Sequence, residues 1–408
     1  MQRLFPCLAL LVLLAGCATE PAPWPSAPPP AVILLPNPPH AMAPPPPSAM
    51  QSAPRPNRSS MMTTAPAPLP SGSWSPQNAR VQGPPARSSP TTYRPVAAGP
   101  ATPSAPPLAP LQPTAAPPPL AGAESLSGRS ILSLQVFLDR HGFSPNCLDG
   151  LIGTRTHEAL LAYETAHGLQ PSTRMDAALI ATLGMPTNAF TTYVVAEEDL
   201  AALTPVPATW LGKSQAQRLG YQTVLELVAE RFHASETAIR NLNPGVMWPN
   251  PQAGTALLVP NPYPAPAVPA ARLRILLSRK LVQALDAQGG LLAQFPCSIG
   301  RDREKRPVGE LKVATCAADP SFVLDPAVFQ EDPEVRALGR KLVIPPGPNN
   351  PVGVAWIGLD RPGFGIHGTP RPEDIGKTES HGCFRLANWN AQRLLRMISI
   401  GMPVTVDP

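Results

Sequence analysis

The residues with the clearest chemical potential lie near the carboxyl end of the chain, where a cysteine follows two histidines. Cys383 closes the string Ser-His-Gly-Cys, and His367 lies upstream in the string Gly-Ile-His-Gly-Thr. A cysteine is a strong nucleophile only as the thiolate, and a neighbouring imidazole can take its proton. His381 and Cys383 would share one face of an extended segment, whereas His367 would have to arrive from an adjacent segment. The residues alone leave open which histidine is the base.

Glycine and polar residues around this cysteine could complete a site that cleaves an amide. Without a metal, such a site needs hydrogen-bond donors for the developing oxyanion, and Gly382 would let a substrate approach the backbone closely. Arg385 can pair with a carboxylate through two parallel hydrogen bonds. Ser380 is interpreted as a hydrogen-bond partner, not as a second nucleophile. With no Cys-x-x-Cys and no His-rich cluster in the chain, the sequence predicts neither a metal nor a cofactor.

The elements that must hold these residues are mostly β-strands. From residue 271 to residue 408, short apolar runs alternate with Gly, Pro and Asn turns, a pattern typical of a mostly-β domain. One helix is expected, from Asn390 to about Ile398. The expected strands are Leu273–Leu277, Leu281–Leu285, Leu291–Phe295, Leu311–Ala314, Val354–Ile357 and Pro403–Val406.

Together, four signals in this region resemble the signature of the YkuD-type L,D-transpeptidases. They are Gly365–Thr369, Ile375-Gly376, Ser380–Cys383, and Arg385 followed by Asn388. Twelve residues separate His367 from Ser380, as in the shorter spacing of that family. Upstream, the strings 296–300, 306–310 and 347–353 also match its pattern, so the resemblance covers essentially all of 271–408. Phe384 is a mild departure, because the family usually has Ile or Val there.

The resemblance implies a role for each candidate residue. His367 would be the base, oriented by the backbone carbonyl of Gly368, and His381 would support the site. Backbone N–H groups around Gly382 and Cys383 would form the oxyanion hole. The other candidates would bind the substrate, and they are Arg385, Ser380, Thr369 and Asn388.

The resemblance also implies a reaction on peptidoglycan. Cys383 would attack the carbonyl of a diamino acid at position three of a tetrapeptide stem and expel the terminal D-Ala. An amine of another stem, or of a wall protein, would take the acyl group. Two alternatives stay open: water could be the acceptor, giving an L,D-carboxypeptidase or hydrolase, or a non-catalytic lipoprotein could tie membrane to wall. The intact His367, His381 and Cys383 argue against the last of these.

The amino-terminal region predicts export and a lipid anchor. An apolar run, Leu8–Leu14, is too short to span a bilayer, and Leu-Ala-Gly-Cys ending at Cys17 resembles a bacterial lipobox. An ordinary secretory signal with a chance cysteine is the alternative. We therefore expect a signal peptide at 1–16, and an acylated Cys17 that anchors the protein at the periplasmic side of a membrane in the cell envelope. The Pro/Ala/Ser-rich stretch 17–122 is expected to be a disordered linker.

Two small domains are expected between this linker and the carboxyl-terminal region. Residues 123–188 show helical apolar spacing interrupted by turns at Asp149-Gly150 and Gly153, and they resemble the three-helix peptidoglycan-binding domain type 1. Residues 191–260 predict strand, helix, helix and strand, with Ser235 as the N-cap of the second helix. They resemble a LysM glycan-binding domain. An insertion from about Leu203 to Gly220 departs from that family, which suggests a degenerate domain used for spacing.

The charge and the cysteine content of the chain bear on its binding partners and on possible disulfides. The net charge is +5, but the basic residues are scattered and no run of like charges reaches five, so nucleic acid is not an expected partner. The expected partners are peptidoglycan stem peptides, glycan and, through the anchor, a membrane. A disulfide between Cys297 and Cys316 is one option that the sequence leaves open.

Overall fold

The computed structural model describes residues 121–408, apart from 123–125, 173, 264, 302–305 and 378–381. The expected signal peptide, Cys17 and almost all of the expected linker lie outside the described residues, as do Ser380 and His381. Within the described part of the chain, no helix has the length and apolar character needed to cross a membrane.

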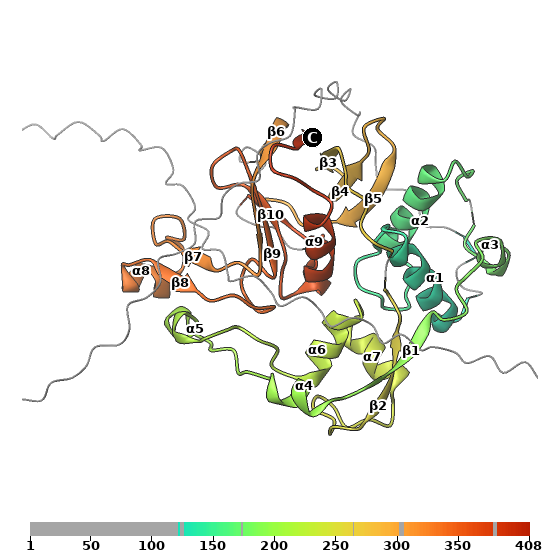
Figure 1. Cartoon of the computed structure of the whole chain (residues 1–408), viewed down its shortest axis with the longest axis horizontal. Coiled ribbons are helices and arrows are strands. Elements are labelled where there is room, and N and C mark those ends of the chain that lie inside the picture. Colours follow the sequence, from blue (N-terminus) through green and yellow to red (C-terminus); the bar gives the residue numbers. More distant parts are fainter. Residues whose placement is uncertain (1–120, 123–125, 173, 264, 302–305, 378–381) are drawn as a thin grey trace, which may run out of the picture. The chain divides into compact units, whose positions relative to one another are not determined.

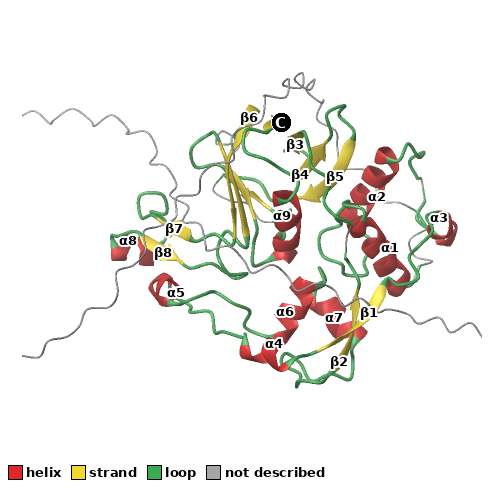
Figure 2. Ribbon diagram, in the orientation of Figure 1, coloured by secondary structure: helices red, strands yellow, loops and turns green. Residues whose placement is uncertain are grey.

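A mixed eight-stranded sheet dominates the carboxyl-terminal region and confirms the mostly-β prediction (Figures 1 and 2). Neighbouring strands run antiparallel except in the β10–β11 and β12–β3 pairs. In sheet order the strands are β11 (Phe384–Arg385), β10 (Gly365–His367), β9 (Ala355–Leu359), β6 (Gly309–Ala318), β12 (Pro403–Asp407), β3 (Arg272–Leu276), β4 (Leu281–Leu285) and β5 (Leu291–Pro296).

Strand β6 makes the sheet curl. Its first half, 309–312, pairs with β12, and its second half, 313–318, pairs with β9 on the other edge. The register shifts between Val313 and Thr315, and such bulges bend and twist a strand. The curled sheet wraps one face around helix α9 (Asn388–Leu395), whose Ala391 and Leu394 are fully buried.

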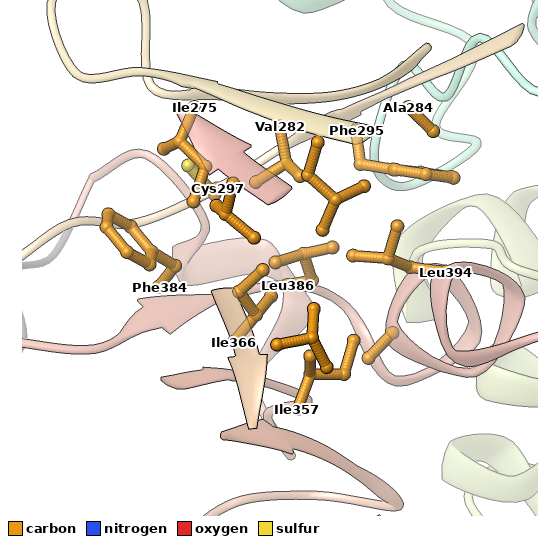
Figure 3. Packing of buried hydrophobic residues seen from close by; sticks show 14 of the residues in the cluster. Ile275, Val282, Ala284, Phe295, Cys297, Ile357, Ile366, Phe384, Leu386 and Leu394 are labelled. Atoms are coloured by element: carbon orange, nitrogen blue, oxygen red, sulfur yellow. The ribbon is translucent and has the colours of Figure 1, made fainter. Parts of the chain in front are cut away.

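The main core lies between this face and α9 (Figure 3). Ile366 of β10 and Phe384 of β11 both point into it, and each is fully buried. Burial of a side chain of this size contributes about 1.5–3 kcal/mol relative to exposure. These two residues therefore determine which faces of β10 and β11 point away from the core.

Several elements of this region were not predicted. Strands β7 (Phe322–Leu324) and β8 (Leu342–Ile344) pair with each other, and helix α8 (Pro333–Leu338) lies between them. Strands of two or three residues, including β10 and β11, are too short to show a period of two. Helix α8 did carry a signal, since Asp332 caps it and a proline occupies its first turn. Helix α9 begins at Asn388 and ends at Leu395, whereas Asn390 to about Ile398 was expected.

The segment 121–188 contains three helices with an apolar core of their own. They are α1 (Gly128–Arg140), α2 (Thr154–Ala166) and α3 (Ala177–Thr182). The expected turn at Gly150 is present, and its φ of +73° is a conformation that favours glycine. The helical character of this segment is confirmed, while its assignment to a peptidoglycan-binding domain type 1 stays a prediction.

The segment 190–260 has the expected order of strands and helices. Strands β1 (Phe190–Val194) and β2 (Ala256–Pro260) pair antiparallel, and α6 (Val224–Arg231) and α7 (Glu236–Leu242) lie between them in the chain. The predicted cap is present, because the Ser235 hydroxyl accepts from the Ala238 N–H. Two further helices were not predicted, α4 (Glu197–Ala201) and α5 (Trp210–Gln215).

The insertion at 203–220 packs against the β7–β8 hairpin and α8. Leu219 is fully buried there with Leu324, Val335 and Ile344, and Trp210 lies against the same cluster. The Trp210 indole N–H donates to the Asp332 carboxylate at 2.8 Å. The insertion therefore has a packing role within the described residues, which all belong to one compact unit.

Candidate active site

The pairing of β10 with β11 brings the predicted histidine and cysteine to one face of the sheet. The two strands are parallel, with Ile366 opposite Phe384 and His367 opposite Arg385. Because Ile366 and Phe384 point into the core, alternation places His367, Arg385 and the preceding Cys383 on the opposite face. Cys383 packs there against a small cluster that includes Trp356 of β9. The adjacent segment from which His367 was expected to reach Cys383 is therefore strand β10.

The surroundings of His367 hold its ring in one orientation. It is 6% exposed, and its Nδ1 lies 2.7 Å from the carbonyl oxygen of Gly368, as the resemblance implied. Since a carbonyl only accepts, Nδ1 carries the proton, and Nε2 of the neutral ring keeps its lone pair. The Trp356 indole stacks on the ring, with centroids 5.8 Å apart. Burial lowers the pKa of His367 to about 4, so the ring is a neutral base at pH 7.

Cys383 carries its thiol on the same face of the sheet as this base. Its Sγ donates to the carbonyl oxygen of Gly363 at 3.5 Å. Burial raises the pKa of the thiol to about 11, while a hydrogen bond with the Gly365 backbone and the charge of Arg385 act in the opposite direction. We expected the imidazole to raise the thiolate fraction, but burial is the largest influence on the thiol pKa and acts against ionisation. The resting pair is a neutral thiol and a neutral imidazole.

Arg385 places a positive charge next to the thiol. Its backbone pairs in both directions with that of Ser298, at 2.9 and 3.0 Å. Burial, followed by the charge of Arg371, lowers the pKa of its guanidinium, and the carboxylate of Asp374 opposes this. An arginine remains a cation in such surroundings. The charge is suited to a carboxylate group on a ligand at this face.

The glycines of the predicted site fit close backbone packing. A Cβ at Gly300 would lie 2.9 Å from the Cα of Gly382, and a Cβ at Gly382 would lie 3.1 Å from the Phe364 ring. A side chain at either position would push apart the segment that carries Cys383. A side chain at Gly382 would thus crowd the Phe364 ring, and the part of Gly382 in an oxyanion hole stays a prediction.

Two predicted substrate-binding residues lie beneath the surface. Thr369 is 6% exposed, and its hydroxyl oxygen accepts from the Arg371 N–H at 3.3 Å. Asn388 is 1% exposed, and both ends of its amide are engaged within the protein. Within the structure the Asn388 side chain therefore bonds to the protein itself, and its contact with a substrate stays a prediction. Its family position signals a site residue, but burial makes it a supporting one.

The other described cysteines differ from Cys383 in their surroundings. Cys147 and Cys297 are buried, and burial raises the pKa of each to about 12. Cys316 is exposed on β6. Among the described residues, Cys297 and Cys316 form no disulfide, so the pairing considered between them is not present. The described residues contain no cluster of three or more candidate ligands for a metal ion.

Sequence reasoning missed two residues that the structure brings to the site. Trp356 stacks on His367, and Glu230 of α6 accepts a hydrogen bond from the Asn388 side chain at 2.8 Å. Trp356 lies within a predicted strand, but only the β9–β10 register, with Trp356 opposite His367, shows its neighbour. Glu230 lies 158 positions from Asn388 in the chain, and no local pattern connects the two.

Comparisons with known proteins agree with the position of this site. Residues 271–406 match the YkuD family model, described as the L,D-transpeptidase catalytic domain. A Bacillus licheniformis protein named YkuD and assigned to the L,D-transpeptidases is 26% identical over 184 residues, which are 45% of this chain and 93% of that protein. YqjB of Bacillus subtilis, with the same assignment, is 32% identical over 118 residues, 28% of this chain and 57% of that protein.

A solved L,D-transpeptidase structure from Mycobacterium smegmatis aligns with 40% of this chain and 76% of its own, at 20% identity. The TM-score of 0.27 is too low to support an inference. The family match instead coincides with the curled sheet and includes His367, Cys383 and Arg385. Residues 271–406 are therefore a YkuD-type L,D-transpeptidase catalytic domain.

Proposed function

We propose that the protein is a peptidoglycan L,D-transpeptidase with Cys383 as nucleophile and His367 as base. The observation that supports this most directly is that the Cys383 thiol and the His367 imidazole share one face of β10 and β11, and that the imidazole Nδ1 is bonded to the Gly368 carbonyl. That tie directs the lone pair of Nε2 away from the backbone, as a base requires.

The reaction proceeds through a thioester. As the Cys383 sulfur attacks the carbonyl of the position-three residue, its proton passes to Nε2 of His367. The tetrahedral intermediate collapses, the amide C–N bond breaks, and the imidazolium returns the proton to the amine of the departing D-Ala. An acceptor amine then loses a proton to His367 and attacks the thioester. The new amide forms as the sulfur leaves and recovers a proton.

Because thiol and imidazole are both neutral at rest, the proton is transferred only during the attack on the substrate. A thiol with a raised pKa and an imidazole with a lowered one do not exchange a proton before substrate binds. The proton moves when the sulfur begins to bond to carbon, because the thiol becomes more acidic at that stage. Arg385 attracts a carboxylate of the stem peptide to the same face, and backbone N–H groups near Gly382 and Cys383 receive the oxyanion.

Product analysis separates the candidate reactions. We expect the purified protein, incubated with a tetrapeptide stem that carries a diamino acid at position three, to release D-Ala and form cross-linked dimers. D-Ala release with free tripeptide as the sole product would instead make water the acceptor and the protein an L,D-carboxypeptidase. Absence of both products, measured by mass spectrometry, would favour a non-catalytic wall-tethering lipoprotein.

The rest of the chain fits an envelope location under this proposal. Cys17 would carry the lipid anchor and 17–122 would be the tether, while 123–188 would bind peptidoglycan and 191–260 would act as a degenerate LysM-like spacer. We expect Cys17→Ser to move the protein from the membrane fraction to the soluble fraction, because the acyl chains supply the membrane affinity. Immunoblots of salt-washed membranes measure this, and retention of the variant with lipid would place the anchor elsewhere.

A further inference from the structure

We infer that Glu230, on helix α6 of the 190–260 segment, is a positioning residue for His367. The 190–260 segment then helps to position the catalytic histidine, in addition to any affinity it has for glycan. The inference rests on the proposed function, since it concerns the same histidine. It is carried by a series of contacts that runs from α6 to the imidazole.

The series begins at the Gly368 carbonyl, which receives the His367 Nδ1 hydrogen bond. The Cα of Gly368 packs directly on Gly353, and a Cβ at Gly353 would lie 2.7 Å from it. The Oδ1 atom of Asn388 touches both glycines so closely that a Cβ at either one would clash with it. The same oxygen accepts from the Val354 N–H at 3.3 Å. The Asn388 amide therefore supports the peptide that orients the imidazole.

Glu230 holds the other end of this amide. The Nδ2 of Asn388 donates to Glu230 Oε2 at 2.8 Å and to the Pro348 carbonyl at 3.1 Å. The bond to Glu230 is the shorter of the two. Helix α6 lies beside the amino-terminal end of α9, where Asn388 is the first residue (Figure 1). Rotation of the amide would break both bonds and withdraw Oδ1 from the glycines.

The carboxylate of Glu230 is itself fixed in place. The Tyr221 hydroxyl donates to its Oε1 at 3.0 Å. Burial raises the pKa of Glu230 to about 7, although the bonds from Asn388 and Tyr221 lower it. The carboxyl group accepts hydrogen bonds from both Asn388 and Tyr221, contacts that an apolar residue at this position could not make.

The 190–260 segment also forms hydrogen bonds with the loop 346–354, which contains Gly353. The Leu219 N–H donates to the Pro346 carbonyl at 2.9 Å, and the Asn349 N–H donates to the Leu219 carbonyl at 3.1 Å. The Asn349 side chain donates to the Gly220 carbonyl at 2.8 Å. The end of the 203–220 insertion thus fixes one side of the loop 346–354 while Glu230 fixes Asn388 on the other. Glu230 therefore acts within a rigid frame, so loss of its bond is transmitted to Asn388 and not absorbed by the loop.

The test measures thiol reactivity directly, without a stem peptide. We expect Glu230→Ala to slow alkylation of Cys383 by iodoacetamide at pH 7 on the order of 10- to 100-fold, because misplacing a catalytic group by about 1 Å has effects of this size. Glu230→Gln keeps an acceptor for Asn388 and should restore most of the rate. Peptide mapping assigns the label to Cys383 and separates it from Cys316.

The pH profile separates positioning from damage to the fold. In Glu230→Ala the alkylation rate should approach that of the wild type as pH rises towards the pKa of the thiol, because thiolate then forms without a base. A merely unstable variant would not recover in this way. With a stem peptide that the wild-type protein turns over, kcat should fall while KM stays within about twofold. Thermal melting of every variant shows whether it is folded.

A matched control and a double variant complete the design. Glu198, an exposed acid on α4 of the same segment, provides the control, and Glu198→Ala should alkylate like the wild type. If Glu230 acts through Asn388, the variant Glu230→Ala/Asn388→Ala should be no slower than Asn388→Ala alone. The inference would be overturned if the double variant were slower than Asn388→Ala by the full factor that Glu230→Ala causes alone. A folded Glu230→Ala variant with the wild-type rate and pH profile would also overturn it. A failure of the transpeptidase proposal would appear separately, in the product assay.

Discussion

Replacing Cys383 with alanine is expected to abolish both D-Ala release and cross-link formation while the fold is kept. The side chain lies on the face of the sheet opposite the main core and is not part of that core, so its loss leaves the core packing intact. Loss of a covalent nucleophile lowers turnover on the order of 10⁶-fold, which here means no product above background. Mass spectrometry of stem peptides measures the loss, and thermal melting verifies the fold.

Cys316 offers a matched control for this variant. It is exposed on β6 and free, so Cys316→Ala should keep wild-type turnover. A carbapenem-type β-lactam, whose strained amide mimics the acyl donor, should add once to the wild-type protein and not to Cys383→Ala. Turnover that persists in Cys383→Ala, or a peptide map with the adduct on Cys297 or Cys316, would refute the nucleophile assignment.

Replacing His367 with alanine is expected to lower Cys383 acylation on the order of 10²–10⁴-fold at pH 7, the usual contribution of a general base. The thiol pKa is raised to about 11, so almost no thiolate exists at this pH without help from the imidazole. The imidazole pKa is lowered to about 4, so the ring accepts a proton across the neutral range. The wild-type rate should therefore fall in acid only well below pH 6.5, as His367 becomes protonated.

The variant should lack this acid limb. Its rate should rise steadily with pH up to the pKa of the thiol, because only spontaneous ionisation supplies the nucleophile. Stopped-time alkylation of Cys383 across the pH range, with peptide mapping, measures both profiles. His381→Ala is the comparison, and it should lose less than His367→Ala. The reverse order would transfer the base role to His381 and leave the nucleophile and reaction class unchanged.

Local features of the chain were sufficient to predict much of this protein. Each of the six predicted strands overlaps an observed one, because a buried strand leaves an apolar run bounded by turn residues. Ser235 was predicted as a helix cap because hydroxyl side chains bond to backbone N–H groups only three residues away. The chemistry of Cys383 and His367 also follows from their types and their context in the chain.

Features that depend on neighbours distant in sequence were not predictable in the same way. The hairpin β7–β8 and the strands β10 and β11 are too short to carry a period, and they exist because partner strands complete their hydrogen bonds. The insertion at 203–220, interpreted from sequence as a departure used for spacing, buries Leu219 against a hairpin more than a hundred residues later in the chain. Nothing within the insertion itself indicates that partner.

The sequence by itself determined which side chains could react, because nucleophilicity and basicity belong to residue types. Only the tertiary structure decided how they act. The parallel register of β10 and β11 puts His367 and Cys383 on one face of the sheet, and burial lowers the pKa of the imidazole and raises that of the thiol. Asn388 was expected to contact the substrate, but in the structure it is buried and its side chain donates a hydrogen bond to Glu230. Strand register and side-chain burial both depend on partners distant in the sequence, so neither can be predicted from one segment alone.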